Sequence, residues 1–181
     1  PDEVVGDLHA QAACNDAGGR ALLEMMDEFG LESIEQVAEE IVRRSETAVR
    51  AKIRELPEGE WESETWGDGF EEPIVIRCSV RIAGDEIFID FTGSSSQSTR
   101  GINVVLNYTH AYASFAVKAA IYPDVPHNEG SFRPVRVTAP PGSILNALDP
   151  APVASRQAVG HFVPSAIFAA LAGALPGRLM A

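Results

Sequence analysis

Apolar residues in the first part of the chain recur at three- and four-residue spacing, which is the period of an amphipathic helix. Gly30 stands where a first helix would end, and Pro57 stands where a second would end. Between them, Ser33 begins the sequence Ser-Ile-Glu-Gln, a capping-box pattern that opens a helix. Residues 2–56 are therefore predicted to form a helical hairpin that acts as a packing element or arm.

From about residue 60 the period changes to two, as in a strand with one buried face. Residues 74–82 alternate in this way, and residues 83–86 supply a turn before a return strand over residues 87–91. This pattern predicts an antiparallel hairpin. Residues 60–66, which contain two tryptophans, are a candidate third strand.

The remaining elements are predicted to alternate between helix and strand. A helix is expected over residues 106–121, a short strand over residues 135–138, and a last apolar helix over residues 158–175 with Pro164 in its first turns. Helices beside a mostly antiparallel sheet define the α+β class. The predicted domains are a helical hairpin arm at residues 1–57 and an α+β core segment at residues 58–181.

Acidic residues outnumber basic ones, 26 against 14, which gives a formal net charge of −12. Nucleic-acid binding is not expected from such a chain, because it needs basic patches that neutralise phosphates. No apolar run approaches the roughly 18 residues of a membrane span. Cys14 and Cys78 form no CxxC pair, which favours two buried thiols in a cytoplasmic protein rather than a disulfide.

The polar loop over residues 92–101 is the main candidate for chemistry. Its glycines allow backbone amides to approach an anion, while hydroxyl and amide side chains can donate hydrogen bonds. The Gly-Lys-Ser/Thr sequence of a Walker A loop is missing, and Ser/Gly-rich loops are also ordinary connections. The side chains of this loop that are predicted to bind substrate are Thr92, Ser94, Ser95 and Gln97.

Two residues outside the loop are predicted to share that role. Asn103 can orient a carbonyl or a lactam, although asparagine also caps helices. Arg156 follows a Pro-rich segment between apolar stretches, so it is expected to be partly buried and to need an anionic partner. The sequence leaves open whether that partner is a structural carboxylate or a group of the substrate.

No metal site and no catalytic residue can be assigned from spacing. The histidines occur at positions without metal-ligand spacing, so a complete metal site is not expected here. A G-x-S-x-G nucleophile elbow is also missing. The histidines are His9, His110, His127 and His161.

Short motifs follow one another along nearly the whole chain. They are Gly6-Asp7-Leu8-His9-Ala10-Gln11, Asp90-Phe91-Thr92-Gly93-Ser94-Ser95 with Gln97, Gly101-Ile102-Asn103, Pro126-His127-Asn128-Glu129-Gly130, Arg133-Pro134-Val135, Pro140-Pro141-Gly142-Ser143-Ile144-Leu145-Asn146 and Pro150-Ala151-Pro152-Val153. In this order and spacing they resemble the hydantoinase B/oxoprolinase family.

The resemblance implies an internal segment of a longer, B-type subunit that helps to open cyclic amides such as hydantoin or 5-oxoproline. It also implies a hydantoinase A-like partner subunit that uses ATP to activate the substrate, and an oligomeric assembly. A divalent metal is expected in the full subunit, with His and Asp ligands upstream of the Gly-Asp-Leu segment rather than in this chain.

The resemblance leaves two other interpretations open. Relatives of the same architecture carboxylate ketones such as acetone or acetophenone. The chain could also be a structural or interface segment that is inactive in isolation. Many relatives carry an Arg and an Asp in the stretch where His161 and Pro164 stand here. At these two positions the chain departs from the family pattern, so the resemblance does not specify the pocket or the substrate there.

Overall fold

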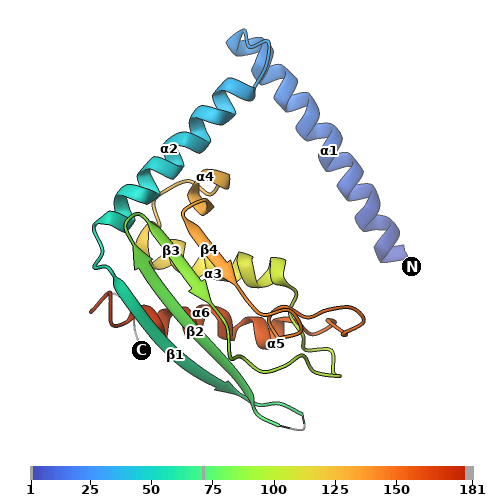
Figure 1. Ribbon diagram of the computed structural model, residues 1–181. Helices are drawn as coiled ribbons and strands as arrows, with labels where there is room; N and C mark the ends of the chain where they lie inside the picture. Colours follow the sequence, from blue (N-terminus) through green and yellow to red (C-terminus); the bar gives the residue numbers. More distant parts are fainter. Residues whose placement is uncertain (1, 71, 178–181) are drawn as a thin grey trace. The chain divides into compact units, whose positions relative to one another are not determined.

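A computed structural model of the chain describes residues 2–70 and 72–177. The chain divides into two compact units, Pro1–Ile41 (unit 1) and Val42–Ala181 (unit 2). Figure 1 shows the elements in chain order. The division into domains at residue 57 stays a prediction.

Unit 1 contains helix α1, Asp2–Phe29, and the beginning of helix α2, Glu35–Arg54. Helix α1 ends where Gly30 adopts a φ of 63°, a left-handed conformation that glycine accepts without steric cost. Leu31 N–H then donates to the Met26 carbonyl at 2.8 Å. The hydroxyl of Ser33 accepts a hydrogen bond from the Glu35 amide at 3.1 Å, so this serine helps to start α2 as predicted.

Unit 2 is built on a four-stranded sheet in the order β1-β2-β3-β4. The strands are β1 (Gly59–Gly67), β2 (Ile74–Ala83), β3 (Glu86–Asp90) and β4 (Val135–Thr138). Strands β1, β2 and β3 pair antiparallel, whereas β4 joins β3 in parallel. With its flanking helices, this sheet confirms the predicted α+β class with a mostly antiparallel sheet.

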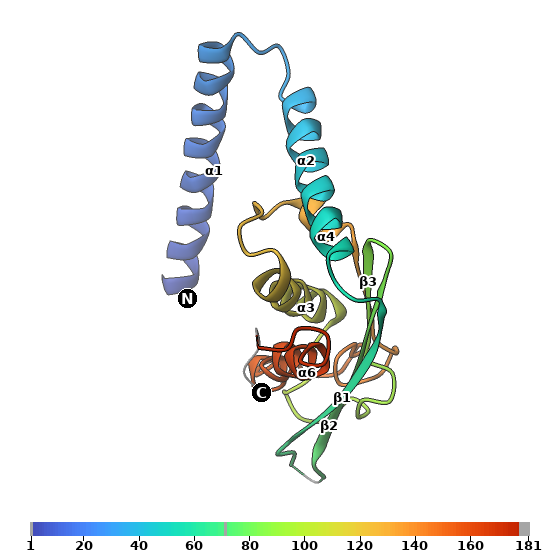
Figure 2. The ribbon, with the colours of Figure 1, turned by 90° about the vertical axis from the view of Figure 1, so that its left-hand side faces the viewer.

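One face of the sheet forms the core of unit 2. Helices α3 (Leu106–Ile121) and α6 (Phe162–Leu171) lie against this face, as Figure 2 shows. Every second residue of β2 is buried, including Ile76 and Val80, and Ile89 of β3 joins them. Burying such apolar surface is the main force that holds the layers together. The opposite face of the sheet carries the polar residues of the alternation.

The last helix differs from the prediction, which places one helix over residues 158–175. The structure divides this region into a short helix α5, Gln157–Gly160, and helix α6, which ends at Leu171. Pro164 has no N–H to donate to the carbonyl of Gly160, so the helical ladder loses a hydrogen bond at this point. That loss accounts for the interruption between the two helices.

The second half of α2 belongs to unit 2, where Val49 and Ile53 are buried in the core. A short helix α4, Glu129–Phe132, lies against it. The Asn128 side-chain amide donates to the hydroxyl of Ser45 at 2.7 Å. At Gly130 the two backbones approach so closely that a Cβ would lie 1.9 Å from the Val42 carbonyl oxygen.

An ionic cluster joins α2 to the β2–β3 turn. Arg50 contacts Asp85 Oδ1 at 2.8 Å and Glu46 Oε1 at 2.9 Å, and Arg54 also binds Asp85. Burial opposes ionisation of Asp85, but hydrogen bonds from Arg54 and Arg50 outweigh it and hold the pKa of Asp85 below its ordinary value of 3.8. The cluster therefore favours the charged carboxylate.

Asp85→Asn is expected to lower the melting temperature of unit 2 near pH 7 and to lose that effect in acid. A carboxyl group whose pKa is lowered by folding contributes stability above its unfolded pKa, and this contribution is lost as the pH falls through the folded pKa. The difference in melting temperature should therefore shrink below pH 3.8. Circular dichroism melts of both proteins test this, and a difference that is the same at pH 7 and pH 3 would contradict it.

Candidate functional site

The predicted loop runs from the end of β3 toward α3, and its side chains are tied to backbone groups. Ser94 Oγ accepts from the Arg77 amide at 3.1 Å, and Ser95 Oγ accepts from the Val75 amide at 2.9 Å. Gln97 Oε1 accepts from the Leu148 amide at 2.8 Å. These contacts fix the loop against β2 and against the 140–148 segment. Their role in binding substrate stays a prediction.

Asn103 lies at the centre of this arrangement and is fully buried. Its Oδ1 accepts from the Ser98 amide at 2.7 Å. Its two Nδ2 hydrogens face three carbonyls, those of Ser98, Arg100 and Pro152 at 2.8–3.0 Å, so one hydrogen is shared between two acceptors. All hydrogen-bonding groups of the amide are thus used. These contacts hold two chain segments together. The contact of Asn103 with substrate stays a prediction.

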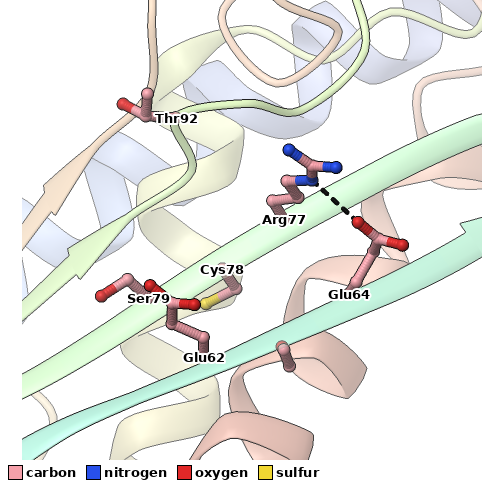
Figure 3. A pocket seen from close by; sticks show the side chains of 7 residues that line it. Glu62, Glu64, Arg77, Cys78, Ser79 and Thr92 are labelled. Carbon is pink, nitrogen blue, oxygen red and sulfur yellow. Dashed lines mark hydrogen bonds and ion pairs between the residues drawn. The ribbon is translucent and has the colours of Figure 1, made fainter.

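A hollow of about 500 Å³ lies on the polar face of the sheet next to the loop. Figure 3 shows Arg77 directed toward Glu64, at 2.8 Å from its carboxylate, while Thr92 stands at the loop end of the hollow. Thr92 Oγ1 donates to Asp90 at 3.0 Å. We call this feature the open-face hollow; its lining residues are Glu62, Ser63, Glu64, Arg77, Cys78, Ser79 and Thr92.

The electrostatics of the open-face hollow are mixed. Glu64 is neutralised by Arg77, and Ser79 donates its hydroxyl proton to Glu60 at 2.6 Å. Within residues 2–70 and 72–177, the Glu62 carboxylate has no hydrogen-bond or ion-pair partner. No sequence signal singles out Glu62, because alternating glutamates on a strand are typical of a solvated face. A site that combines a carboxylate, a paired guanidinium and hydroxyls can hold a polar ligand.

Cys78 belongs to the wall of this hollow but is almost completely buried. Burial raises the pKa of the Cys78 thiol to about 12, and the nearby charge of Asp90 adds to the shift. Because the thiolate is the nucleophilic form, a rise from the ordinary 9.0 reduces its fraction roughly 10³-fold at neutral pH. Cys78 is therefore unsuited to nucleophilic catalysis.

The expectation that both thiols are buried is correct for Cys78 and wrong for Cys14, which is exposed. Cys78 is therefore expected to resist a thiol reagent in the folded protein, whereas Cys14 reacts. Titration with Ellman's reagent at pH 8 should modify one thiol in the native chain and both in denaturant. The variant Cys14→Ser provides the control, because it should show almost no reaction until it is unfolded. Rapid native labelling of Cys14→Ser would show that Cys78 is accessible.

Arg156 lies at the other end of the loop system. The amide of Ser155 donates to the Gly101 carbonyl at 2.6 Å, which brings the Arg156 segment next to the loop. The side chain is exposed, so the expectation that it is partly buried is wrong. The apolar residues around it do not bury it, because it stands in a turn rather than on the inner face of a helix or strand. Its contact with substrate stays a prediction.

Two tyrosines of α3 complete the surroundings of Arg156. The guanidinium lies 5.8 Å from the centroid of the Tyr108 ring, and Tyr108 stacks on Tyr112 at a centroid distance of 4.6 Å. His161 meets Tyr112 edge-on at 6.4 Å. We call these residues the tyrosine–arginine cluster. No motif points to the two tyrosines, although their i,i+4 spacing on a predicted helix is a usable signal.

No group of three or more His, Cys, Asp or Glu side chains within residues 2–70 and 72–177 is arranged to hold a metal ion. The helices in the same part of the chain also lack the length and apolar character needed to cross a membrane.

The geometry is that of a polar loop and hollow on a sheet-and-helix scaffold, and the chain belongs to the hydantoinase B/oxoprolinase family. The family profile matches residues 1–181. The B-type subunit of a putative D-/L-hydantoinase from Pseudomonas sp. (strain NS671) is 31% identical over 195 residues. That alignment covers 100% of this chain and 33% of the relative, so the chain spans about a third of its length.

Two solved structures have a similar fold. The crystal structure of ATP-dependent caprolactamase from Pseudomonas jessenii superposes with a TM-score of 0.85 at 27% identity, over 96% of this chain and 31% of the other. A nucleotide-free acetone carboxylase superposes with a TM-score of 0.75 at 20% identity, over 88% of this chain and 23% of the other. At that identity the second likeness shows a shared fold alone.

Proposed function

We propose that the chain functions as part of the B-type subunit of an ATP-dependent hydrolase that opens cyclic amides. The observation that carries this proposal is the family match over residues 1–181. The likeness to a caprolactamase at a TM-score of 0.85 supports it further. Because the chain spans only a third of its hydantoinase relative, the activity is assigned to the complete enzyme, and the isolated chain is expected to be inactive.

The chemistry explains why a second subunit is part of the proposal. Resonance makes an amide carbonyl a poor electrophile, and phosphorylation of the lactam oxygen by ATP would remove that stabilisation. That step releases ADP. Water then adds to the activated carbon, and the C–N bond breaks as the nitrogen takes up a proton, which leaves an amine and an acyl phosphate on one molecule. A second water hydrolyses the acyl phosphate to a carboxylate and inorganic phosphate. We propose that a hydantoinase A-like subunit performs the ATP-dependent step, in an oligomeric, cytoplasmic assembly. The two free cysteines fit a reducing compartment.

The family resemblance also implies a divalent metal, which we place in parts of the enzyme outside this chain. The residues of this chain would bind and orient the substrate. Thr92 and Arg156 are the proposed direct contacts, because both side chains are exposed near the loop. We propose a less direct role for the other candidates, which hold the loop in shape and present its polar surface: Ser94, Ser95, Gln97 and Asn103.

The proposal is tested by assaying the complete complex, with and without ATP, on hydantoins, 5-oxoproline and caprolactam, and on acetone with bicarbonate. We expect ring opening that consumes ATP. Bicarbonate-dependent carboxylation would instead favour the ketone carboxylase, which the shared fold of acetone carboxylase keeps as the second candidate. A purely structural role is favoured if the chain co-elutes with the ATP-using subunit while activity survives changes throughout the loop.

Arg156→Gln is expected to lower kcat/KM of the complete complex by about tenfold, because an ionic hydrogen bond to substrate is worth on the order of 1.5–3 kcal/mol. Arg81→Gln is the matched control. Arg81 is also exposed and also lies over an aromatic ring, 4.0 Å from the Phe88 centroid. If both variants stay within about twofold of the parent enzyme, Arg156 has no role in binding.

A further inference from the structure

The tyrosine–arginine cluster has the features of a ligand-binding site, and it is separate from the hydrogen bonds that hold the loop over residues 92–101. Three donor groups from two segments meet there: two phenols of α3 and the guanidinium of Arg156, which precedes α5. The interaction with the Tyr112 side chain is the main cause of the raised pKa of Tyr108; the charge of Arg156 acts in the opposite direction. The Tyr108 hydroxyl is thus electrostatically coupled to the guanidinium.

The cluster is held in place rather than loosely exposed. The rings of Tyr108 and Tyr112 are nearly parallel, at 13°. On its other side Tyr108 meets the bare backbone of Gly160, where a Cβ would lie only 2.3 Å from the ring. Glycine is therefore the residue that allows this packing. A site whose donors are fixed before binding loses less entropy when a ligand arrives.

Arg156 lacks the carboxylate partner that several other arginines of unit 2 have. In the part of the chain that the structure describes, no carboxylate forms an ion pair with it. This is notable in a chain with 26 acidic and only 14 basic residues. By contrast, carboxylates pair with Arg50, Arg54, Arg77, Arg133 and Arg136. The guanidinium is available for an anion from outside, and its planar fork suits a carboxylate.

An apolar hollow of about 310 Å³ adjoins the cluster along α3 and is lined by Ala111, Tyr112 and Phe115. Tyr112 belongs to both features, so the donors and the hollow are continuous. Phe115 is 57% exposed, which leaves its ring free to cover a ligand. A ligand that used both features would carry an anionic group beside a compact apolar body.

We propose that Arg156, Tyr108 and the adjoining hollow form a binding site for a carboxylate attached to a compact apolar body. The source of that ligand rests on the proposed function. Hydrolysis of a cyclic amide creates a carboxylate on a short carbon skeleton, and the new amine lies at the other end of that skeleton. The guanidinium and the Tyr108 hydroxyl bind the carboxylate, and Phe115 and Tyr112 contact the carbon skeleton. His161 borders the site next to Tyr112.

The test is a binding titration on the chain without ATP or partner, followed by NMR of the tyrosine rings and the arginine Nε–H groups. The probe is cyclohexanecarboxylate. Cyclohexanecarboxamide keeps the ring without the charge, acetate keeps the charge without the ring, and inorganic phosphate offers a different anion. We expect the carboxylate probe to shift the signals of Arg156, Tyr108 and Tyr112, and to bind more tightly than the other three.

Variants locate the site. Arg156→Gln should weaken binding of cyclohexanecarboxylate by about tenfold, and Phe115→Ala should weaken it by several-fold while leaving acetate unchanged. Arg81→Gln should bind as the parent does. Thermal melts establish that each variant is folded. The variant Tyr108→Phe removes only the hydroxyl and preserves the packing of the ring, so it provides a second test of the site.

Each alternative outcome overturns part of the proposal. If cyclohexanecarboxamide binds as tightly as cyclohexanecarboxylate, the site does not recognise an anion. If acetate or phosphate binds as tightly, the hollow does not contribute to binding. If the NMR signal of Arg156 does not shift when the probe is added, the proposed site is refuted. The titration needs neither ATP nor catalysis, so it is independent of the activity assay. If the complete enzyme opens lactams but the probe does not bind here, only this binding site is refuted. If the probe binds here but the enzyme opens no cyclic amide, only the proposed function is refuted.

Discussion

Replacing Asn103 with alanine is expected to destabilise unit 2 by about 3 kcal/mol, a large effect for one side chain. The buried amide makes hydrogen bonds to the Ser98 amide and to the carbonyls of Ser98, Arg100 and Pro152. Alanine cannot replace any of them. The cost of leaving buried polar groups unpaired exceeds the modest net value of the hydrogen bonds themselves.

Asn103→Asp should also be strongly destabilising, because a carboxylate oxygen would replace the amide nitrogen in front of three carbonyl oxygens. Urea unfolding followed by circular dichroism measures both losses. The matched control is Asn107→Ala, since Asn107 is exposed on α3 and alanine favours helix. Asn103 would have a different role if its alanine variant kept full stability but the complete enzyme lost substrate affinity.

Gly130→Ala is expected to destabilise the contact between α4 and α2 by about 2–3 kcal/mol. The added methyl group would lie 1.9 Å from the Val42 carbonyl oxygen and 2.7 Å from its carbon. Both atoms belong to helix backbone, which cannot move aside as a flexible side chain can. The contacts between Asn128 and Ser45 and between Arg133 and Glu46 hold the same two helices together, so they would be strained as well.

The control for this prediction is Gly101→Ala. There an added Cβ would meet Ala154 atoms at an ordinary 3.6 Å, so the change should stay within about 0.5 kcal/mol. Differential scanning calorimetry of both variants measures the contrast. If Gly130→Ala melts at the same temperature as Gly101→Ala, the close approach of α4 to α2 is not part of the folded state.

The elements that could be predicted are those whose signal is local. Gly30 marks the end of α1 because its left-handed conformation depends only on neighbouring residues. The two-residue period of β2 reports directly which side chains enter the core. The parallel pairing of β3 with β4 has no such local signal. It joins Ile87 to Val135 across a long intervening segment that includes α3, and nothing near either strand specifies that partner.

The site is harder to predict for a related reason. The sequence indicates Asn103 as a candidate, but its partner Pro152 is distant along the chain, so its buried position among carbonyls cannot be foreseen. For Arg156, apolar neighbours predict partial burial, and that rule holds on a regular helix or strand but not in a turn. The stacking of Tyr108 on Tyr112 follows a visible spacing, yet only the packing of Gly160 makes it a fixed pair.

Strand β1 has a consequence for the behaviour of the protein in solution. It stands at the edge of the sheet, where backbone groups can act as a template for another strand. Glu60, Glu62 and Glu64 project from it in a row on the polar face. Arg77 neutralises Glu64, but no ion pair in the described residues neutralises Glu60 or Glu62. A second copy that added its own β1 to this edge would bring these carboxylates close to their counterparts, and like charges on adjacent strands repel. The charge on this strand therefore disfavours edge-to-edge pairing with a second copy of the chain.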